Sequence, residues 1–216
     1  MTPSPVLIDP AILYFGTPVA LLSTVDREGT RNLAPMSSIF WLGHTAVLGM
    51  GSRSQTSMNM IETKEVVISL ASVDQVDVVD RLALTSGVSA VADDKAAVGY
   101  RYVEDKFAHG GVTPAPSATV APCRVSECPV SLEGRVIDVR PLVERDRGSI
   151  DSPSAFVFSV DICRVWVHPS IQDPSKPNRI DPLRWRPLIM SFQKLFGLGE
   201  QIAPSRLSTI DEEWYR

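Results

Sequence analysis

Short apolar segments alternate with polar or glycine-containing turns through the first third of the chain. Segments rich in Val, Leu and Thr predict strands over residues 17–26, 31–40, 46–50 and 65–71. Pro35 lies inside the second segment, and a strand tolerates proline only at an edge or a bulge. In the polar turn 51–57, Ser52 and Gln55 have the spacing of a capping box, which predicts a short helix to Ile61 or Glu62.

The remaining two thirds of the chain predict two long strands and a few helices. Ser72 and Gln75 form a second capping-box pair before apolar residues at helical spacing, Val76, Val79, Leu82 and Ala83. Residues 93–102 predict one short helix, and 109–119 predict a loop. The long strands are expected at 128–141 and 155–168, with a bulge near Cys163 where the apolar alternation breaks.

A change in composition marks the C-terminal segment. Four prolines between 169 and 182 predict a linker, and a helix is expected over 183–196, with Gly197 as its C-cap. We therefore expect a domain at 1–168 and a Pro-rich extension at 169–216. The extension is expected to pack on the barrel or on a dimer partner through its apolar side chains, Trp185, Leu188, Ile189, Phe192 and Phe196.

The order of elements favours a mainly β fold with helices. Six strands that suit antiparallel pairing indicate a closed or split barrel with helical decoration. A doubly wound parallel sheet needs a helix after nearly every strand, and the first three strands lack one.

Composition narrows the class of partner and the compartment. The chain has 216 residues, 44% of them hydrophobic, and a net charge of -4, which excludes a disordered or fibrous protein and argues against nucleic acid as a partner. Three cysteines, an odd and low number, indicate reduced thiols. The N-terminal segment lacks the pattern of a signal peptide, and no apolar run is long enough to cross a membrane. We expect a cytoplasmic protein without a membrane partner.

The turn at 51–57 is the first candidate site. It follows a strand and opens a helix, and the free N–H groups of a helix start attract anions. Serine and threonine hydroxyls and the guanidinium of Arg53 add donors suited to phosphate. The alternative is that Ser52 only caps the helix while Arg53 lies in water. The turn lacks the Gly-Lys pair of a P-loop.

The strand at 31–38, with sequence RNLAPMSS, is the second candidate. A proline-containing strand leaves backbone donors and acceptors unpaired, and a flat heterocycle can use them; the alternative is a bulged edge strand without a ligand. The three histidines do not cluster, and the cysteines lack zinc-site spacing, so no metal is expected. The absence of a Gly-x-Ser-x-Gly motif gives hydrolase chemistry no support.

Together these segments resemble a known family. The combination consists of the Asn-x-Ala-Pro-x-Ser strand at 32–37, the Ser-Arg-Ser-x-Thr turn at 52–56, the Asp-Lys-Phe segment at 105–107 and the Glu-Cys-Pro-Val segment at 127–130. In this order, from about Tyr14 to His168, the chain resembles the flavin reductase-like FMN-binding split-barrel family, which includes the flavoredoxins. The resemblance implies a six-stranded antiparallel split β-barrel and a homodimer with FMN at the subunit interface.

The resemblance also implies site residues. The FMN phosphate is expected at the turn after the third strand, with Ser52, Arg53, Ser54, Gln55, Thr56 and Asn59. The ring is expected along the second strand, with Asn32, Ala34, Pro35, Met36, Ser37 and Ser38. The Asp-Lys-Phe segment, here with Lys106 and Phe107, is expected to approach the flavin.

The resemblance therefore implies that the protein is an oxidoreductase of flavin reductase type, which transfers hydride from NAD(P)H to FMN. A monooxygenase or another acceptor would receive the electrons, and His109 is the candidate for positioning nicotinamide. Many members carry Gly-Asp-His where this chain has Ser152, Pro153 and Ser154. That histidine assists nicotinamide binding in some relatives, so its absence favours the alternative of a flavin-binding electron carrier without its own NAD(P)H oxidation. A third alternative is an interaction protein that keeps the fold without FMN.

Overall fold

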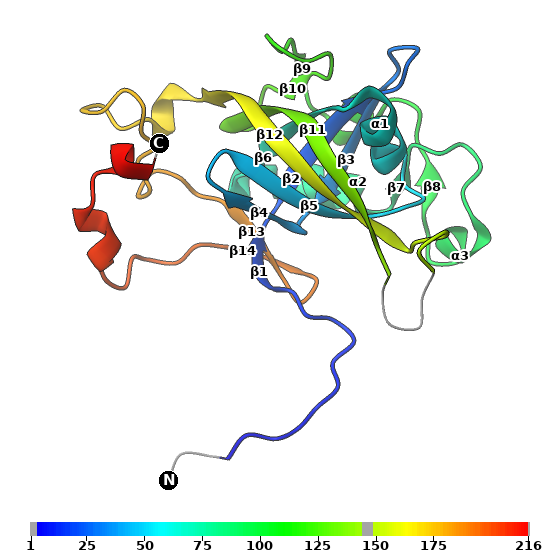
Figure 1. Ribbon diagram of the computed structural model, residues 1–216, viewed down its shortest axis with the longest axis horizontal. Coiled ribbons are helices and arrows are strands. Elements are labelled where there is room, and N and C mark those ends of the chain that lie inside the picture. The colour runs from blue at the N-terminus through cyan, green and yellow to red at the C-terminus, as the bar shows by residue number, and fades with distance from the viewer. Residues whose placement is uncertain (1–3, 144–148, 216) are drawn as a thin grey trace.

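A seven-stranded antiparallel sheet forms the centre of the computed structural model, which describes residues 4–143 and 149–215 (Figure 1). Its strands follow the order β3 (Arg31–Met36), β2 (Ala20–Val25), β6 (Glu65–Leu70), β11 (Val130–Leu142), β12 (Ala155–Val167), β5 (Thr45–Gly51) and β4 (Ile39–Leu42). The edge strands β3 and β4 are consecutive in the chain, joined only by Ser37 and Ser38. Because each residue spans at most roughly 3.3–3.6 Å, the sheet curls until its two edges come close together.

The predicted mainly β class is confirmed, but the count of six strands is not. Residues 31–40, expected as one strand, form β3 and part of β4 at opposite edges of the sheet. The chain leaves the first edge after Met36 and pairs with β5 from Ile39 onward. Pro35 lies on the edge strand β3, as its missing N–H requires.

The two long strands confirm the predicted bulge. In the pairing of β11 with β12, Glu133 lies opposite Arg164 and Gly134 lies opposite Ile162, so Cys163 is the extra residue. A Cβ at Gly134 would collide with Val160 Cγ1 and lie 3.3 Å from the Asp161 carbonyl oxygen. The glycine therefore permits a close approach of the two strands.

Two hydrophobic clusters hold the sheet and its helices together. β2 is buried on both faces: Ala20 and Leu22 belong to the first cluster, whereas Leu21 belongs to the second. The first cluster lies inside the curled sheet, with Leu48, Met60, Ile68, Phe158 and Val160 among its members. The second joins the outer face to two helices through Leu33, Val79, Leu82 and Phe107. This double burial explains the continuous apolar run of the strand.

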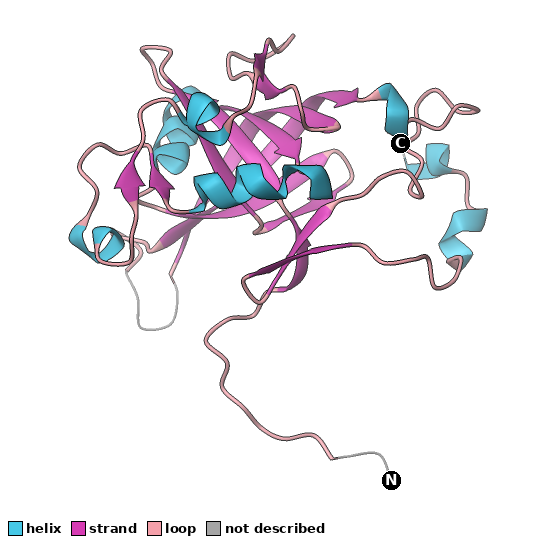
Figure 2. Ribbon diagram, turned by 180° about the vertical axis from the view of Figure 1, so that it is seen from behind, coloured by secondary structure: helices cyan, strands magenta, loops and turns pink. Residues whose placement is uncertain are grey.

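The described residues form four α-helices beside the sheet: α1 (Gln55–Thr63), α2 (Val76–Ala83), α3 (Asp93–Ala96) and α4 (Lys106–Gly110); Figure 2 shows helices in cyan. The capping box of Ser72 and Gln75 is confirmed at the 3₁₀ turn Val73–Gln75, which runs into α2. The short helix expected within 93–102 is confirmed as α3. None of the helices in the described parts of the chain is long and apolar enough to cross a membrane.

Two predictions about helices were wrong. The N-cap of α1 is Ser54, which has the extended backbone of a cap and accepts from Ser57 N, because the helix begins only at Gln55; the Ser52 hydroxyl donates to the carbonyl of Pro153. Residues 109–119 were expected to form a loop, but residues 109 and 110 belong to α4. That helix starts because Asp105 accepts from Ala108 N, and it ends at Gly111 in the left-handed conformation.

The C-terminal helix expected over 183–196 was also wrong. Strands β13 (Leu188–Ser191) and β14 (Lys194–Gly197) form a hairpin, and β13 also pairs with β1 (Phe15–Pro18). Phe192 and Gln193 both have positive φ, 45° and 61°, as a two-residue hairpin turn requires. Leu188 is buried in the second cluster, and the boundary at residue 168 stays a prediction.

Short elements complete the described chain. β7 (Thr85–Ser86) pairs with β8 (Arg101–Tyr102), and β9 (Pro114–Ala115) pairs with β10 (Arg124–Val125). Further 3₁₀ turns lie at Pro169–Ile171, Arg206–Thr209 and Glu212–Tyr215. The N-terminal segment before β1 extends away from the body of the protein (Figure 1).

Candidate functional site

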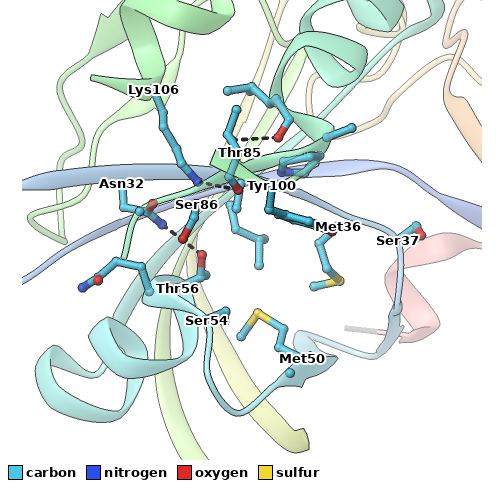
Figure 3. Close-up of a pocket in the computed structure, with 18 of the residues that line it drawn as sticks. Asn32, Met36, Ser37, Met50, Ser54, Thr56, Thr85, Ser86, Tyr100 and Lys106 are labelled. Atoms are coloured by element: carbon cyan, nitrogen blue, oxygen red, sulfur yellow. Dashed lines mark hydrogen bonds between the residues drawn. The ribbon is translucent and has the colours of Figure 1, made fainter. Parts of the chain in front are cut away.

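A cavity of about 420 Å³ lies where β3, the end of β5 and the start of α1 meet the segment 82–106. Figure 3 shows the side chains that converge on it. Ten of the residues predicted for ligand binding line this cavity: Asn32, Ala34, Pro35, Met36, Ser37, Ser38, Ser54, Gln55, Thr56 and Lys106. The two candidate segments, recognised separately in the sequence, therefore form one site.

The start of α1 gives the cavity an anion-attracting end. α1 has nine residues, and its first turn contains no acidic side chain. Its unpaired N–H groups and dipole favour a negative ligand. Thr56 lies in this first turn and is itself buried, and its hydroxyl accepts from Asn32 Nδ2 at 2.9 Å.

Asn32 presents an unused acceptor at the same end. Its side chain is 4% exposed, and within the described residues Oδ1 has no hydrogen-bond partner. An unpaired buried acceptor is costly, and because Oδ1 lies against Gly87, a ligand donor would reach it only after a small rotation of the Asn32 amide. Gly87 keeps the backbone of the facing loop close, because a Cβ there would collide with Asn32 Oδ1 and lie 2.9 Å from Gln55 Cβ.

Two lysines make the cavity electropositive. Lys106 is only 4% exposed, and its Nζ donates to the Thr85 carbonyl at 3.5 Å, a long hydrogen bond. Burial, and secondarily the charge of Lys95, lowers the pKa of Lys106 to about 8. Lys95 Nζ lies 5.8 Å from the centre of the Tyr100 ring, and no aspartate or glutamate is among the described lining residues.

Ser52 and Arg53 lie outside this cavity, in an adjoining outer groove of about 890 Å³. The groove shares Tyr14, Ser38 and residues 49–51 with the cavity. Arg53 forms an exposed ion pair with Asp94, with Nη2 and Oδ2 2.6 Å apart. This hydrogen bond with Arg53 lowers the pKa of Asp94. The expected contact of Arg53 with a ligand stays a prediction; in this structure the Nη2 of its guanidinium donates to Asp94.

Three further predicted residues are not in the cavity lining. Asn59 is buried, donates to Thr24 Oγ1 and accepts from Gln55 Nε2, so it supports the start of α1 from behind. Phe107 packs in the second hydrophobic cluster. His109 lies half-buried in α4, and its Nε2 is buried without a hydrogen-bond partner among the described residues.

Sequence reasoning missed the contribution of the segment 82–100 and of Tyr14. Thr85, Ser86, Gly87, Lys95 and Tyr100 line the cavity, although their sequence predicts only a short helix. Tyr14 hydrogen-bonds Ser38 across 2.7 Å and connects the N-terminal segment to the link between β3 and β4. The Ser-Gly pair at 86–87 was the available signal, since glycine often marks a close backbone approach.

Comparison with known proteins then decides the family. The model of the flavin reductase like domain matches residues 12–198. The chain belongs to this family. This flavin reductase-like protein is 35% identical to the protein YdfE of Bacillus subtilis (strain 168) over 195 residues, which cover 90% of each chain.

Solved structures support the same fold. Flavoredoxin of Desulfovibrio vulgaris (Miyazaki F) superposes with a TM-score of 0.74 at 21% identity, covering 96% of this chain and 100% of that one. Nitrilotriacetate monooxygenase component B from Bacillus cereus gives 0.73 at 20% identity, with 94% and 100% covered. A Shewanella frigidimarina protein with a split barrel domain gives 0.65 at 17% identity, with 88% and 85% covered. At these identities the likeness concerns the fold alone.

Proposed function

We propose that this flavin reductase-like protein binds FMN in the 420 Å³ cavity and transfers hydride from NAD(P)H to the flavin. The observation that carries the proposal is the convergence of strand β3 and the start of α1 on one cavity with two lysines. Family membership supports a flavin ligand, and the cavity volume lies in the range of about 300–1,000 Å³ typical of ligand sites.

The chemistry of the lining fits a flavin mononucleotide. One end is polar: the start of α1 and Lys106 make it positive, and Asn32 Oδ1 adds an unpaired acceptor beside them. Ala34, Pro35, Met36 and Met50 supply apolar surface beside it. A ligand with a phosphate, hydroxyl donors and a flat heterocycle uses all of these features.

The residues that would hold FMN follow from this division. The N–H groups and hydroxyls around Ser54 and Thr56 would bind phosphate, and Asn32 would accept a hydrogen bond from the ligand. Because β3 is an edge strand, its outer backbone groups are free to hydrogen-bond the rim of the ring. Bound FMN supplies hydride acceptance and electron transfer, while the protein orients it and stabilises negative charge.

The remaining parts of the reaction belong to the same proposal. A second copy of the chain would close the open outer groove and place FMN at a homodimer interface. NAD(P)H would stack on the exposed ring face, with His109 as the candidate for its position. The neighbour named as a monooxygenase component supports a monooxygenase as electron acceptor. We keep the cytoplasm as the predicted location.

One observation favours a second function, a flavin-binding electron carrier without its own NAD(P)H oxidation. Ser152, Pro153 and Ser154 line the outer groove there, and none of the described residues that line the groove carries an imidazole for nicotinamide. The Ser52 hydroxyl instead holds the Pro153 carbonyl at 2.7 Å.

Flavin binding and flavin reduction are tested separately. The visible spectrum of freshly purified protein and a fluorescence titration with FMN test binding. A colourless protein that does not bind added FMN would contradict the proposal and favour an interaction protein that keeps the fold without FMN. Stopped-flow reduction by NADH and by NADPH tests hydride transfer. Tight FMN binding without measurable reduction would favour the carrier. Replacing His109 with Ala is expected to slow reduction while FMN affinity stays nearly unchanged.

A further inference from the structure

Two adjacent charged residues of the short helix α3 line two different sites, the outer groove and the main cavity. Asp94 pairs with Arg53 at the rim of the outer groove. Lys95, the next residue, lines the main cavity. The ion pair therefore connects α3 to the turn before α1 while the neighbouring ammonium lies at the ligand site.

Lys95 and Lys106 form a pair of cations without an acidic partner. Among the described residues neither forms an ion pair, and the cavity lining contains no carboxylate. Their mutual repulsion contributes to the lowered pKa of Lys106. An anion that bound between or beside two such cations would offset their repulsion and stabilise the charged form of each.

Arg53 differs from both lysines in exposure, pairing and its place outside the main cavity, although it lines a smaller adjoining pocket together with Lys95. Its side chain is 65% exposed, lies outside the main cavity, and has a carboxylate partner at 2.6 Å. A ligand anion that bound Arg53 would have to share the guanidinium with the Asp94 carboxylate or replace it. The cations at the main cavity without such a competing carboxylate are Lys95 and Lys106.

We propose that Lys95 and Lys106 together hold the anionic group of the ligand, and that Arg53 is a positioning residue that acts through Asp94 to keep Lys95 in the cavity. The inference rests on the proposed binding of FMN and names the residues that recognise its phosphate. It changes the role expected for Arg53 from a direct ligand contact to an indirect one.

Fluorescence titrations with FMN and with riboflavin, which lacks the phosphate, test this assignment. Lys95→Gln and Lys106→Gln are each expected to weaken FMN binding about tenfold, the loss of one charge-assisted hydrogen bond, with riboflavin affinity nearly unchanged. Lys194→Gln is the matched control, because it removes one exposed positive charge on β14, away from the cavity.

The Asp94→Asn variant separates the two roles of Arg53 by the sign of its effect. If Arg53 positions Lys95, breaking the ion pair weakens FMN binding severalfold, and the loss disappears when Lys95 is already Gln. If Arg53 binds phosphate directly, Asp94→Asn releases the guanidinium and strengthens FMN binding, which would overturn the positioning role. Arg53→Lys keeps a cation opposite Asp94 and should retain more affinity than Arg53→Gln.

Failure of the inference differs from failure of the proposed function. Wild-type protein that binds FMN more tightly than riboflavin, with both lysine variants unchanged, would refute the two-lysine site and leave flavin binding intact. Equal losses for FMN and riboflavin in the lysine variants would also refute it, because they indicate damage to the whole cavity. Wild-type protein that binds neither compound would refute both proposals.

Discussion

Glu133 offers the sharpest test of how the long strands hold the loop above them. Its side chain on β11 is fully buried, yet none of the described residues forms an ion pair with it. Oε1 accepts from Ala118 N at 2.9 Å and Trp166 Nε1 at 2.6 Å. Oε2 accepts from Thr119 N at 2.7 Å and Thr119 Oγ1 at 2.6 Å. One carboxylate therefore ties the loop before β10 to both long strands.

Glu133→Gln keeps the shape of the side chain but replaces one acceptor oxygen with a donor. If the amide nitrogen occupies the Oε2 position, the Thr119 hydroxyl can rotate to accept from it, but Thr119 N–H loses its acceptor. An orphaned buried donor costs about 1–3 kcal/mol, and the remaining bonds lose their charge assistance. Removing a buried charge offsets part of this loss. We expect the free energy of unfolding to fall by about 2–4 kcal/mol.

Urea and thermal denaturation at neutral pH measure this difference. A loss of that size lowers the melting temperature by roughly 4–16 °C in a chain of this length. Glu127→Gln is the matched control, because the Glu127 carboxylate also accepts a backbone N–H, from Thr113, but lies exposed. Its substitution should change stability by less than about 0.5 kcal/mol.

The pH dependence gives an independent check. Burial alone would raise the pKa of Glu133, but the hydrogen bonds from Thr119, Ala118 and Trp166 lower it below its usual value of 4.5. The stability that this carboxylate contributes is present above the unfolded-state pKa and is lost as pH falls through the lower folded-state pKa. The difference between wild type and Glu133→Gln should therefore narrow below about pH 4.5. Equal stability of the Glu133 and Glu127 variants at neutral pH would refute the reasoning.

Three further predictions concern the cavity and the C-terminal hairpin. Gly87→Ala should weaken the binding of both FMN and riboflavin and lower the free energy of unfolding by about 1–3 kcal/mol, because the Cβ of the new alanine would collide with Asn32 Oδ1. Gly199→Ala is the control for both measurements, because a Cβ at Gly199 meets open space. Leu188→Ala should lower the free energy of unfolding in urea by about 2–5 kcal/mol, and a negligible loss would contradict its place in the core. FMN affinity should fall as pH rises above about 8, because Lys106 in the ligand-free protein loses its proton there. Lys106→Gln should remove this dependence on pH. A wild-type affinity that stays constant through this range would count against a charged Lys106 at the site.

The sequence by itself determined the features that depend on near neighbours along the chain. The strands at 65–71 and 155–168, the capping box of Ser72 and Gln75 and the bulge at Cys163 were all predicted. Each follows from side-chain alternation or from a hydrogen bond across a few residues. The strand 31–38 and the turn 51–57 were recognised as site segments for the same reason, since their composition carries the signal locally.

Only the tertiary structure decided which element each ambiguous segment forms. Residues 183–196 were expected to form a helix, yet residues 188–197 form a hairpin because Leu188 enters the second core cluster and β13 pairs with β1. Residues 31–40 divide into two strands because the curled sheet offers them partners at its two edges. Pairing between distant segments contributes more than local propensity in both cases.

The same distinction applies to the candidate site. Arg53 lies in a recognisable turn, but its pairing with Asp94 depends on where α3 packs. Lys95 and Lys106 lie eleven residues apart, on two short helices that no local pattern connects, and the fold alone brings them to one cavity. The charge of that cavity comes from contacts between segments distant in sequence, which is why composition and spacing could identify the strand and the turn but not the cations beside them.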